Sequence, residues 1–356
     1  MAHFAARTWV RFDMITREEA LDLFRSDDLI GIGMEADSMR RRWHPEGVVS
    51  YIIDRNINYT NFCTEYCSFC AFYRPMGHAE GYILPKETIF QKIQETIELG
   101  GTGVLMQGGL HPDLKVEWYE DLFRSIKQRF RIHLHCLSAP EVTNIADVSG
   151  LSLRDTIARL RDSGLDSIPG GGAEILDDAV RHRISRLKCS TNEWVDVHRT
   201  AHELGMRTTA TMMFGCGETI EQRMNHLELV RNLQEETGGF TAFIPWSFQR
   251  ENTSLGRFVK EEATAVEYLK TLAISRIYLD NFENVQSSWV TQGLKTCQLG
   301  LRFGGNDVGS IMIEENVVSA AGAHHHASEE ELRRMIRDAG FIPKQRDTLY
   351  RTYFLN

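Results

Sequence analysis

Short apolar runs alternate with longer amphipathic stretches along most of this chain. Apolar runs rich in β-branched residues are typical of buried strands, and the stretches between most of them repeat apolar residues with the period of a helix. The run Val48–Ile53 predicts the first strand. Seven further runs predict strands at Gly103–Met106, Ile132–Leu137, Leu165–Ile168, Arg207–Met213, Thr241–Ile244, Asn284–Ser288 and Leu301–Phe303.

Several of the helical stretches have recognisable ends. Thr16 followed by Glu19 is a capping box, which predicts the start of a first helix. Residues 86–99 repeat isoleucine on one helical face and stop at a pair of glycines. A capping box at Ser328 opens a C-terminal helix that ends at Gly340. Strands and helices therefore alternate along the chain.

This alternation predicts an α/β fold with a parallel sheet, and eight strand–helix units are the number that closes a (β/α)8 barrel. On that prediction residues 1–47 form a helical N-terminal extension, residues 48–315 form the barrel, and residues 316–356 form a C-terminal helical segment packed on it. The sequence shows no low-complexity linker and no internal repeat that would divide the chain further.

Glycine-rich or polar segments follow five of the predicted strands. In a barrel these strand ends meet at one mouth, where active sites lie. Glycine at such a position lets the backbone approach a ligand closely. Any one segment could be only a turn, but five around one mouth predict a site. They are Gly108-Gly109, Ser138, Gly170–Glu174, Gly215–Glu218 and Gly304–Asp307.

Composition narrows the class of protein. The 356 residues are 42% hydrophobic and 25% charged, as in ordinary globular proteins. The net charge of −9 argues against nucleic acid or an anionic membrane as the main partner. Seven cysteines, no long apolar span and no apolar leader between Met1 and Met14 favour the reducing cytoplasm without membrane insertion.

Three cysteines form the most informative pattern in the sequence. Cys63, Cys67 and Cys70 follow the first predicted strand with the spacing C-x3-C-x2-C. Electron-transfer clusters are usually closed by four cysteines. Three thiolates can hold three irons of a cubane cluster and leave the fourth iron open, which suits a cluster that binds a substrate as well as an electron.

Structural zinc is the alternative for this triplet. Zinc takes four nitrogen or sulfur ligands, usually in two pairs. His78 or His111 could complete a site of three cysteines and one histidine, so zinc stays open at this point. The other four cysteines are isolated in sequence and offer no second pair; they are Cys136, Cys189, Cys216 and Cys297.

Three segments around the triplet resemble one enzyme family. They are Asp54–Asn61, Gln107–Pro112 and Pro169–Ile175. Together with the cysteine spacing, they resemble the radical S-adenosylmethionine (SAM) enzymes of the futalosine route to menaquinone and of deazaflavin synthesis. The resemblance runs from about Ile15 to the C-terminus. Later segments resemble the member that cyclises dehypoxanthine futalosine rather than its siblings: Phe243–Gln249, Ser288–Gly293 and Gln345–Tyr350.

The resemblance implies the cofactors and their ligands. A [4Fe–4S] cluster would be held by the three cysteines of the triplet, and the amine and carboxylate of SAM would chelate the open iron. Phe69 would pack near the adenine, and the turn Gly108-Gly109 would receive the methionine end of SAM. Further SAM contacts are implied at Ser138, Glu174, Arg183, Lys188, Met213 and Glu218.

The resemblance also implies the chemistry. A 5′-deoxyadenosyl radical would abstract the C4′ hydrogen of the substrate sugar, the carbon radical would close a ring on the aryl group, and loss of an electron and a proton would restore aromaticity. The benzoate of the substrate needs a cationic partner, and the lost proton needs an acceptor. Candidates are Arg55, Arg250 and Arg302 for the benzoate, His111, Asp280 and Glu314 for the proton, and Tyr59 and Asn306 as further contacts.

Other interpretations stay open in the sequence alone. An aminofutalosine synthase or a deazaflavin-forming relative would use the same cluster and barrel. A zinc-stabilised binding protein would use the cysteines without catalysis. The radical interpretation requires a reducing electron donor such as flavodoxin or ferredoxin. The run His324–His326 could bind a metal or form a solvated loop.

Overall fold

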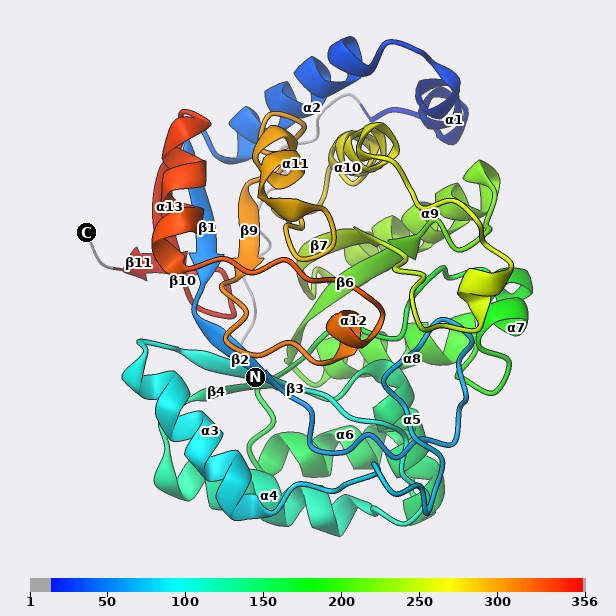
Figure 1. The fold of residues 1–356 in the computed structure, drawn as a ribbon, viewed down its shortest axis with the longest axis vertical. Coiled ribbons are helices and arrows are strands. Elements are labelled where there is room, and N and C mark those ends of the chain that lie inside the picture. The colour runs from blue at the N-terminus through cyan, green and yellow to red at the C-terminus, as the bar shows by residue number, and fades with distance from the viewer. Residues whose placement is uncertain (1–13, 355–356) are drawn as a thin grey trace.

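A parallel sheet curls through the middle of the molecule, and most helices lie outside it (Figure 1). The computed structural model describes residues 14–354. Seven strands pair in chain order, each with the next one along the sequence. Their bounds are β2 Asp54–Ile57, β3 Gly103–Met106, β4 His133–Cys136, β5 Ser167–Ile168, β6 Arg207–Phe214, β7 Phe240–Ser247 and β8 Asn284–Val285.

A further pair of strands closes this sheet into a ring. β1 (Val48–Ile52) runs almost directly into β2 and pairs in parallel with β9 (Asp307–Ser310). β9 also reaches β8, because Gln286 and Asp307 form a parallel bridge. Since β1 and β2 act as one strand, the ring over residues 14–354 has eight members, and the predicted (β/α)8 barrel is confirmed.

Helices connect the strands and bury their apolar faces on the outside of the barrel. In α3, for example, Ile89 and Ile93 are fully buried. Among residues 14–354, no helix combines the length and apolar character needed to cross a bilayer. The connecting helices are α3 Lys86–Glu98, α4 Val116–Arg129, α5 Ala139–Ser149, α6 Leu153–Asp162, α7 Asp178–Ile184, α8 Thr191–Glu203, α9 Ile220–Thr237, the 3-10 turn η1 Leu255–Arg257, α10 Ala265–Tyr278, α11 Gly293–Gly300 and α12 Val317–Ala320.

The N-terminal segment packs on the barrel through two helices, α1 (Arg17–Arg25) and α2 (Leu29–Trp43). The predicted capping box is confirmed: Glu19 N donates to Thr16 Oγ1 at 3.2 Å, and Thr16 N donates to Glu19 Oε2 at 2.7 Å. α1 lies against α9 and α10, and α2 lies against α10 (Figure 1). The prediction that no signal peptide begins the chain falls largely on residues 1–13, which lie outside the described residues.

The C-terminal segment contains strands as well as the predicted helix. α13 (Glu329–Asp338) begins at the confirmed capping box of Ser328. β10 (Ile342–Arg346) then pairs in parallel with β1, and β11 (Thr352–Phe354) pairs antiparallel with β10. The segment is therefore built into the edge of the sheet at β1. The boundaries at residues 47 and 315 stay predictions.

The prediction of a strand at Leu301–Phe303 is wrong. These residues form the turn after α11, and the eighth strand of the ring is β9. Leu301 is fully buried because it packs in a smaller core with Val49 and Trp289. The apolar run therefore marks the end of a helix. As a consequence, the run Gly304–Asp307 precedes a strand and lies at the opposite end of the barrel from the mouth.

Candidate active site at the barrel mouth

The three predicted cluster ligands lie on residues 58–74, the cysteine loop, which follows β2 at the barrel mouth. Cys63 and Cys67 are each 8% exposed, and Cys70 is partly exposed. Burial raises the pKa of the Cys63 and Cys67 thiols above the usual range. Such thiols are poor free nucleophiles, and they become thiolates when cationic iron or zinc is bound.

Backbone hydrogen bonds fix the cysteine loop to other loops of the mouth. Thr64 N donates to Leu110 O at 3.1 Å, after β3. Ser68 N donates to Ile184 O at 2.8 Å, at the end of α7, and Leu255 N donates to Ser68 O at 2.8 Å. Loops that follow β3, β5 and β7 therefore position the loop between them. The structure thus holds the three thiols in place from several sides.

The turn after β3 packs directly against the cysteine loop. A Cβ atom on Gly109 would lie 2.2 Å from Phe62 O and 2.8 Å from Cys63 Cβ, so only glycine permits this contact. Gly109 N also donates to Thr60 O at 3.0 Å. The predicted role of this turn at the methionine end of SAM stays a prediction. The geometry adds a second role, which is to support the cysteine loop.

The buried carboxylate of Glu141 accepts hydrogen bonds from the same turn. Glu141 Oε1 accepts from Gly108 N and from Tyr59 OH, both at 2.8 Å. Glu141 Oε2 accepts from Ser138 N at 2.7 Å and from Ser138 Oγ at 2.6 Å, which caps α5. Burial raises the pKa of Glu141 although these donors oppose the change. The polar groups of Tyr59 and Ser138 are thus engaged inside the protein.

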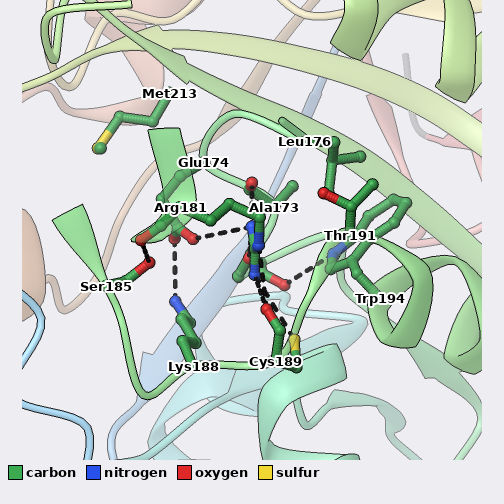
Figure 2. Close-up of polar contacts among 12 residues, drawn as sticks. Ala173, Glu174, Leu176, Arg181, Ser185, Lys188, Cys189, Thr191, Trp194 and Met213 are labelled. Carbon is green, nitrogen blue, oxygen red and sulfur yellow. Dashed lines mark hydrogen bonds and ion pairs between the residues drawn. The ribbon is translucent and has the colours of Figure 1, made fainter. Parts of the chain in front are cut away.

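Glu174 and Lys188 lie together beside the cysteine loop. Lys188 Nζ is 3.0 Å from Glu174 Oε1 (Figure 2). The same atom is 5.3 Å from the centre of the Phe69 ring of that loop. Burial opposes the charge of Lys188, but the neighbouring carboxylate outweighs burial and raises its pKa, so the side chain stays cationic. Glu174 adopts a left-handed backbone with φ 39°. Its Oε2 is buried without a hydrogen-bond partner, as a position that meets a polar ligand would be.

Arg181 links the loops that carry Glu174 and Lys188, which together form the Glu174 corner. It was not predicted from the sequence. Its Nη1 donates to Gly172 O at 3.1 Å and to Ala173 O at 2.7 Å, and its Nε donates to Cys189 O at 3.0 Å. The guanidinium also lies 3.8 Å from Glu174 Oε2 (Figure 2). It therefore joins the glycine-rich loop after β5 to the loop that carries Lys188.

Replacing Arg181 by methionine should destabilise the chain strongly. The change leaves buried carbonyl groups unpaired, and breaking such a buried network costs about 3–5 kcal/mol. Urea unfolding of the cluster-free protein measures the loss. Arg183→Met, on the same helix, is the matched control, because Arg183 is exposed and, among the residues that the structure describes, donates only to Gly217 O at 2.7 Å. Equal midpoints for the two variants would contradict this role of Arg181.

Two other predicted SAM contacts lie at the end of β6. Met213 N donates to Glu174 O at 3.0 Å, so this strand adjoins the Glu174 loop. Glu218 is fully enclosed and accepts from Gly215 N at 2.8 Å, Cys216 N at 2.9 Å and Arg223 Nη2 at 2.6 Å. The charge of Arg223 and hydrogen bonds from Arg223 and from backbone N–H groups, including Gly215 N, keep its pKa low although burial alone would raise it. The carboxylate of Glu218 therefore stabilises the turn Gly215–Glu218, which contains it.

A cavity of about 320 Å³ lies inside the barrel next to Glu174. Strand side chains alternate between the two faces of a sheet, so Asp54 and Asn56 of β2 face the cavity while Arg55 faces outward. Arg55 instead pairs with Glu95 Oε2 on α3 at 2.7 Å. Other polar residues that line the cavity are Gln107, His135, Thr209, Thr211, Gln286, Ser288, Thr291, Ser310, Glu315, Arg346, Thr348 and Tyr350.

Three predicted substrate contacts lie at the far end of the barrel. Asp280 precedes β8 and pairs with Arg231 Nη2 at 2.8 Å. Asn306 precedes β9, where its Oδ1 accepts from Val285 N at 2.9 Å. Arg302 follows α11 and stacks 4.3 Å from the centre of the Phe341 ring. The structure does not bring these residues to the cavity.

The remaining predicted contacts lie near the mouth but outside the cavity lining. Glu314 pairs with Lys92 Nζ at 2.6 Å. His111 accepts from Asp113 N at 3.1 Å, and burial lowers its pKa. Arg250 lines a separate open groove of about 1010 Å³ that also reaches Cys70. The sequence therefore predicted that these residues lie close to the site, but it did not show whether their side chains face the cavity.

Asp54 is a carboxylic acid of the cavity with a displaced pKa. Burial raises its pKa to about 6, although a hydrogen bond from Ser310 and the charge of Arg346 oppose the change. Arg346 is itself bound to Asp307, with Nη2 3.0 Å from Oδ1. The structure thus provides an acid–base group inside the barrel that the sequence analysis did not single out. The run Asp54-Arg55-Asn56 is polar throughout, so the sequence does not show which of these side chains faces the inside of the barrel.

Asp54→Asn should change stability in a pH-dependent way. The folded-state pKa lies above the unfolded value, so ionisation of Asp54 opposes folding as pH rises from about 4 through about 6. A difference of two pKa units between the folded and unfolded states changes the free energy of unfolding by about 3 kcal/mol at most. Thermal unfolding at pH 4 and pH 8 should therefore show that the variant is more stable than wild type only at pH 8. Asp338→Asn, an exposed control, should show no such difference, and a flat profile for Asp54→Asn would contradict the assignment.

Two family descriptions match the chain. Residues 57–230 match the radical SAM superfamily, and residues 237–355 match the CofH/MqnC C-terminal region. The first match contains the cysteine loop and the Glu174 corner. The second contains β7 to β10, which supply much of the cavity lining.

Curated relatives match almost the whole chain. Cyclic dehypoxanthine futalosine synthase of Halalkalibacterium halodurans is 50% identical over 342 residues, 96% of this chain and 92% of that protein. The protein of that name from Streptomyces coelicolor is 46% identical and covers 94% and 85%. A 5-amino-6-(D-ribitylamino)uracil–L-tyrosine 4-hydroxyphenyl transferase from Methanothermobacter thermautotrophicus is 43% identical over 95% and 94%.

Solved structures share the fold. Methylornithine synthase (PylB) superposes with a TM-score of 0.71 at 18% identity, covering 93% of this chain and 94% of that one. The FeFe-hydrogenase maturase HydG from Carboxydothermus hydrogenoformans superposes with a TM-score of 0.74 at 16% identity, covering 95% and 78%. At these identities the likeness concerns the barrel alone.

Proposed function

The chain belongs to the radical SAM superfamily, among the cyclic dehypoxanthine futalosine synthases and their relatives, and from this membership we propose that it cyclises dehypoxanthine futalosine in menaquinone biosynthesis. The observation that carries the proposal is 50% identity to a curated synthase over 96% of the chain. The cysteine triplet and the glycine-rich corner around Glu174 lie at one barrel mouth, as an enzyme of this kind requires.

The donors at the mouth fit the cofactors of this superfamily. Cys63, Cys67 and Cys70 would hold a [4Fe–4S] cluster, since its ligands are spread over separate irons. Glu174, whose Oε2 has no hydrogen-bond partner, and Lys188 would bind the polar groups of SAM. When bound, these cofactors supply a single electron and the adenosyl radical that removes hydrogen from the substrate. The chain's own residues position the reactants and exclude water.

The substrate would occupy the barrel cavity, next to Glu174. Asn56 and Gln107 line the wall of the cavity near the cysteine loop, and Asn56 Oδ1 is buried without a hydrogen-bond partner. A polar sugar could satisfy such a group. Glu315, Val317 and Val318, which follow β9, also line the cavity and cover it. This cover would keep the radical chemistry away from solvent.

The open groove beside Cys70 is where we place the electron donor, a carrier such as flavodoxin or ferredoxin. Cys70 is the most exposed of the three predicted ligands and lines this groove. Arg74, Arg250 and Arg257 line it as well and offer positive charge to an acidic carrier, beside several glutamates. All seven cysteines of the chain are free thiols, which suits the reducing cytoplasm.

Anaerobic reconstitution followed by a substrate panel tests the proposed function. The reconstituted chain should carry about four irons per chain and cleave SAM when dehypoxanthine futalosine and a reductant are present. The panel would include the substrate of aminofutalosine synthase and the pair 5-amino-6-(D-ribitylamino)uracil and tyrosine. Turnover of either alternative without cyclisation of dehypoxanthine futalosine would contradict the proposal. Zinc in place of iron would contradict the radical interpretation as well.

A further inference from the structure

One histidine of the cavity has a ring nitrogen with no partner. His135, on β4, lines the cavity, and its Nδ1 is 2.7 Å from Ser167 Oγ. Within residues 14–354 the structure gives Nε2 of this ring no hydrogen-bond partner. Burial lowers the pKa of His135 to about 3, and the charges of His133 and Arg346 act in the same direction. The imidazole is therefore neutral at physiological pH, with a lone pair available.

Ser167 connects His135 to a second histidine. Its Oγ is also 2.7 Å from Nε2 of His133, two residues earlier on β4. Side chains two apart on a strand share a face, and Ser167 stands opposite His135 in the register of β4 and β5. Ser167 is 1% exposed, so its hydroxyl bridges the two rings without competing solvent. A hydroxyl can donate to one ring while it accepts from the other.

The second histidine leads away from the mouth. His133 begins β4, so it lies toward the N-terminal end of the barrel, and Asp166 and Lys127 act on its charge. Lys127 Nζ contacts Asp166 Oδ2, and the two side chains are 30% and 34% exposed. The hydrogen bonds of Ser167 to both rings therefore form a path from the cavity to His133, which is partly exposed near the end of the barrel opposite the mouth.

We infer that His135, Ser167 and His133 form a proton exit from the cavity, with His135 Nε2 as the group that takes the proton lost when the substrate's aryl ring regains aromaticity. This inference rests on the proposed function, because only a ring-closing reaction on an aryl group releases that proton. His135 would act as a catalytic residue, and Ser167 and His133 would act as positioning residues for it.

The step balances in atoms and electrons. Ring closure on the aryl group leaves a radical with five π electrons and one tetrahedral carbon that bears hydrogen. That C–H bond breaks, its electron pair enters the ring, one electron leaves to a one-electron acceptor of the iron–sulfur class, and six π electrons remain. The proton goes to His135 Nε2. The Nδ1 proton moves to Ser167 Oγ, the hydroxyl proton moves to His133 Nε2, and the Nδ1 proton of His133 passes to solvent.

Asp54 is the other acid–base group in the cavity. Its carboxyl group is hydrogen-bonded to Ser310 and lies near Arg346 and Asp307, which also bear on its charge. Burial favours the neutral form of this carboxyl group, although Ser310 and Arg346 favour the charged form. The His135 path differs because hydrogen bonds lead from it to His133, which is partly exposed. Proton transfer by a positioned base contributes about 10²–10⁴ in rate, so loss of the path should be visible in turnover.

Ser167→Ala tests the path, because it removes the bridging hydroxyl and leaves both rings in place. The reconstituted variant would be given SAM, a reductant and dehypoxanthine futalosine deuterated at C4′. We expect labelled 5′-deoxyadenosine at a rate within about twofold of wild type, at least about tenfold less cyclised product, and an organic radical that accumulates in the electron paramagnetic resonance spectrum. His133→Asn, which changes the far end of the path, should behave in the same direction.

A matched control and a second readout separate the path from a fold defect. Ser275→Ala removes an equally buried hydroxyl, bonded to Thr271 O at 2.7 Å outside the cavity, and should match wild type. Nitrogen-15 NMR of the histidine rings in the cluster-free protein should show that Ser167→Ala changes the tautomer or pKa of His135.

The path is overturned if Ser167→Ala keeps the wild-type ratio of product to 5′-deoxyadenosine. It is also overturned if both fall together with no accumulated radical, or if Asp54→Asn alone uncouples them. Absence of cyclised product from the wild-type enzyme would instead overturn the proposed function, so the two failures are distinguishable.

Discussion

Cys67→Ala is expected to remove both the iron–sulfur cluster and all cleavage of SAM. A cluster with an open iron has only three protein ligands, so loss of one thiolate leaves too few to hold it. The same result is expected for Cys63 and Cys70. Iron and sulfide analysis after anaerobic reconstitution, together with 5′-deoxyadenosine formation, measures both losses.

Cys297→Ala provides the matched control for this change. Cys297 is fully buried in the smaller core, where its thiol contacts Ser287 O at 3.3 Å. The variant should therefore bind a full cluster and cleave SAM at the wild-type rate. A fully loaded cluster in Cys67→Ala would contradict the ligand assignment. So would an equal loss of iron in Cys297→Ala, since a fold defect would then explain both.

Gly109→Ala is expected to lower cluster content by at least about fivefold, although the residue binds no iron. Its Cβ would lie 2.2 Å from Phe62 O, a separation that forces the backbone of the cysteine loop to move. A shift of about 1 Å in a preorganised site is enough to impair it. Iron content of the reconstituted protein measures the effect, and SAM binding should fall with it.

Gly205→Ala is the control for the glycine substitution. Gly205 has φ 80° and nothing within 4 Å of an added Cβ, so the variant suffers backbone strain of about 1–2 kcal/mol without a clash. It should lose some stability and keep its cluster. If Gly109→Ala kept a full cluster while Gly205→Ala did too, the turn after β3 would not support the cysteine loop.

The curated relatives of this chain are named for different reactions. Curated transferases of the 5-amino-6-(D-ribitylamino)uracil type are 38–43% identical to this chain over most of its length. On the proposed function, the cysteine loop and the Glu174 corner would serve the cofactor chemistry that the superfamily has in common. The residues lining the cavity would then decide which substrate is held and what its radical attacks. The proposed path through His135 starts among the cavity residues, not among the residues proposed to bind the cofactors.

The sequence predicted the parts of the fold that depend on local pattern. Seven of the eight strands and both capping boxes follow from periodicity and end signals, which act over a few residues. The strand at Leu301–Phe303 was wrong because a buried helix end and a short strand have the same apolar character. The actual strand, Asp307–Ser310, is polar because Asp307 is buried in a salt bridge with Arg346.

The sequence predicted the candidate site less completely. The spacing of the three cysteines is characteristic by itself, so the sequence was enough to single them out as candidate cluster ligands. Arg55 was predicted as a benzoate contact, but Asp54 and not Arg55 lines the cavity. Neighbouring strand residues face opposite ways, and the sequence does not show which face is inside. Arg181 was missed for a different reason: it acts through hydrogen bonds to carbonyl groups of a distant loop, which leave no signal in residue type.

Transfer of one labelled hydrogen tests the central claim most directly. The reconstituted wild-type chain would be incubated with SAM, a reductant and dehypoxanthine futalosine deuterated at C4′. The account predicts singly deuterated 5′-deoxyadenosine and a product closed into a ring at that carbon, in equal amounts. Unlabelled 5′-deoxyadenosine, or adenosine joined covalently to the product, would contradict it.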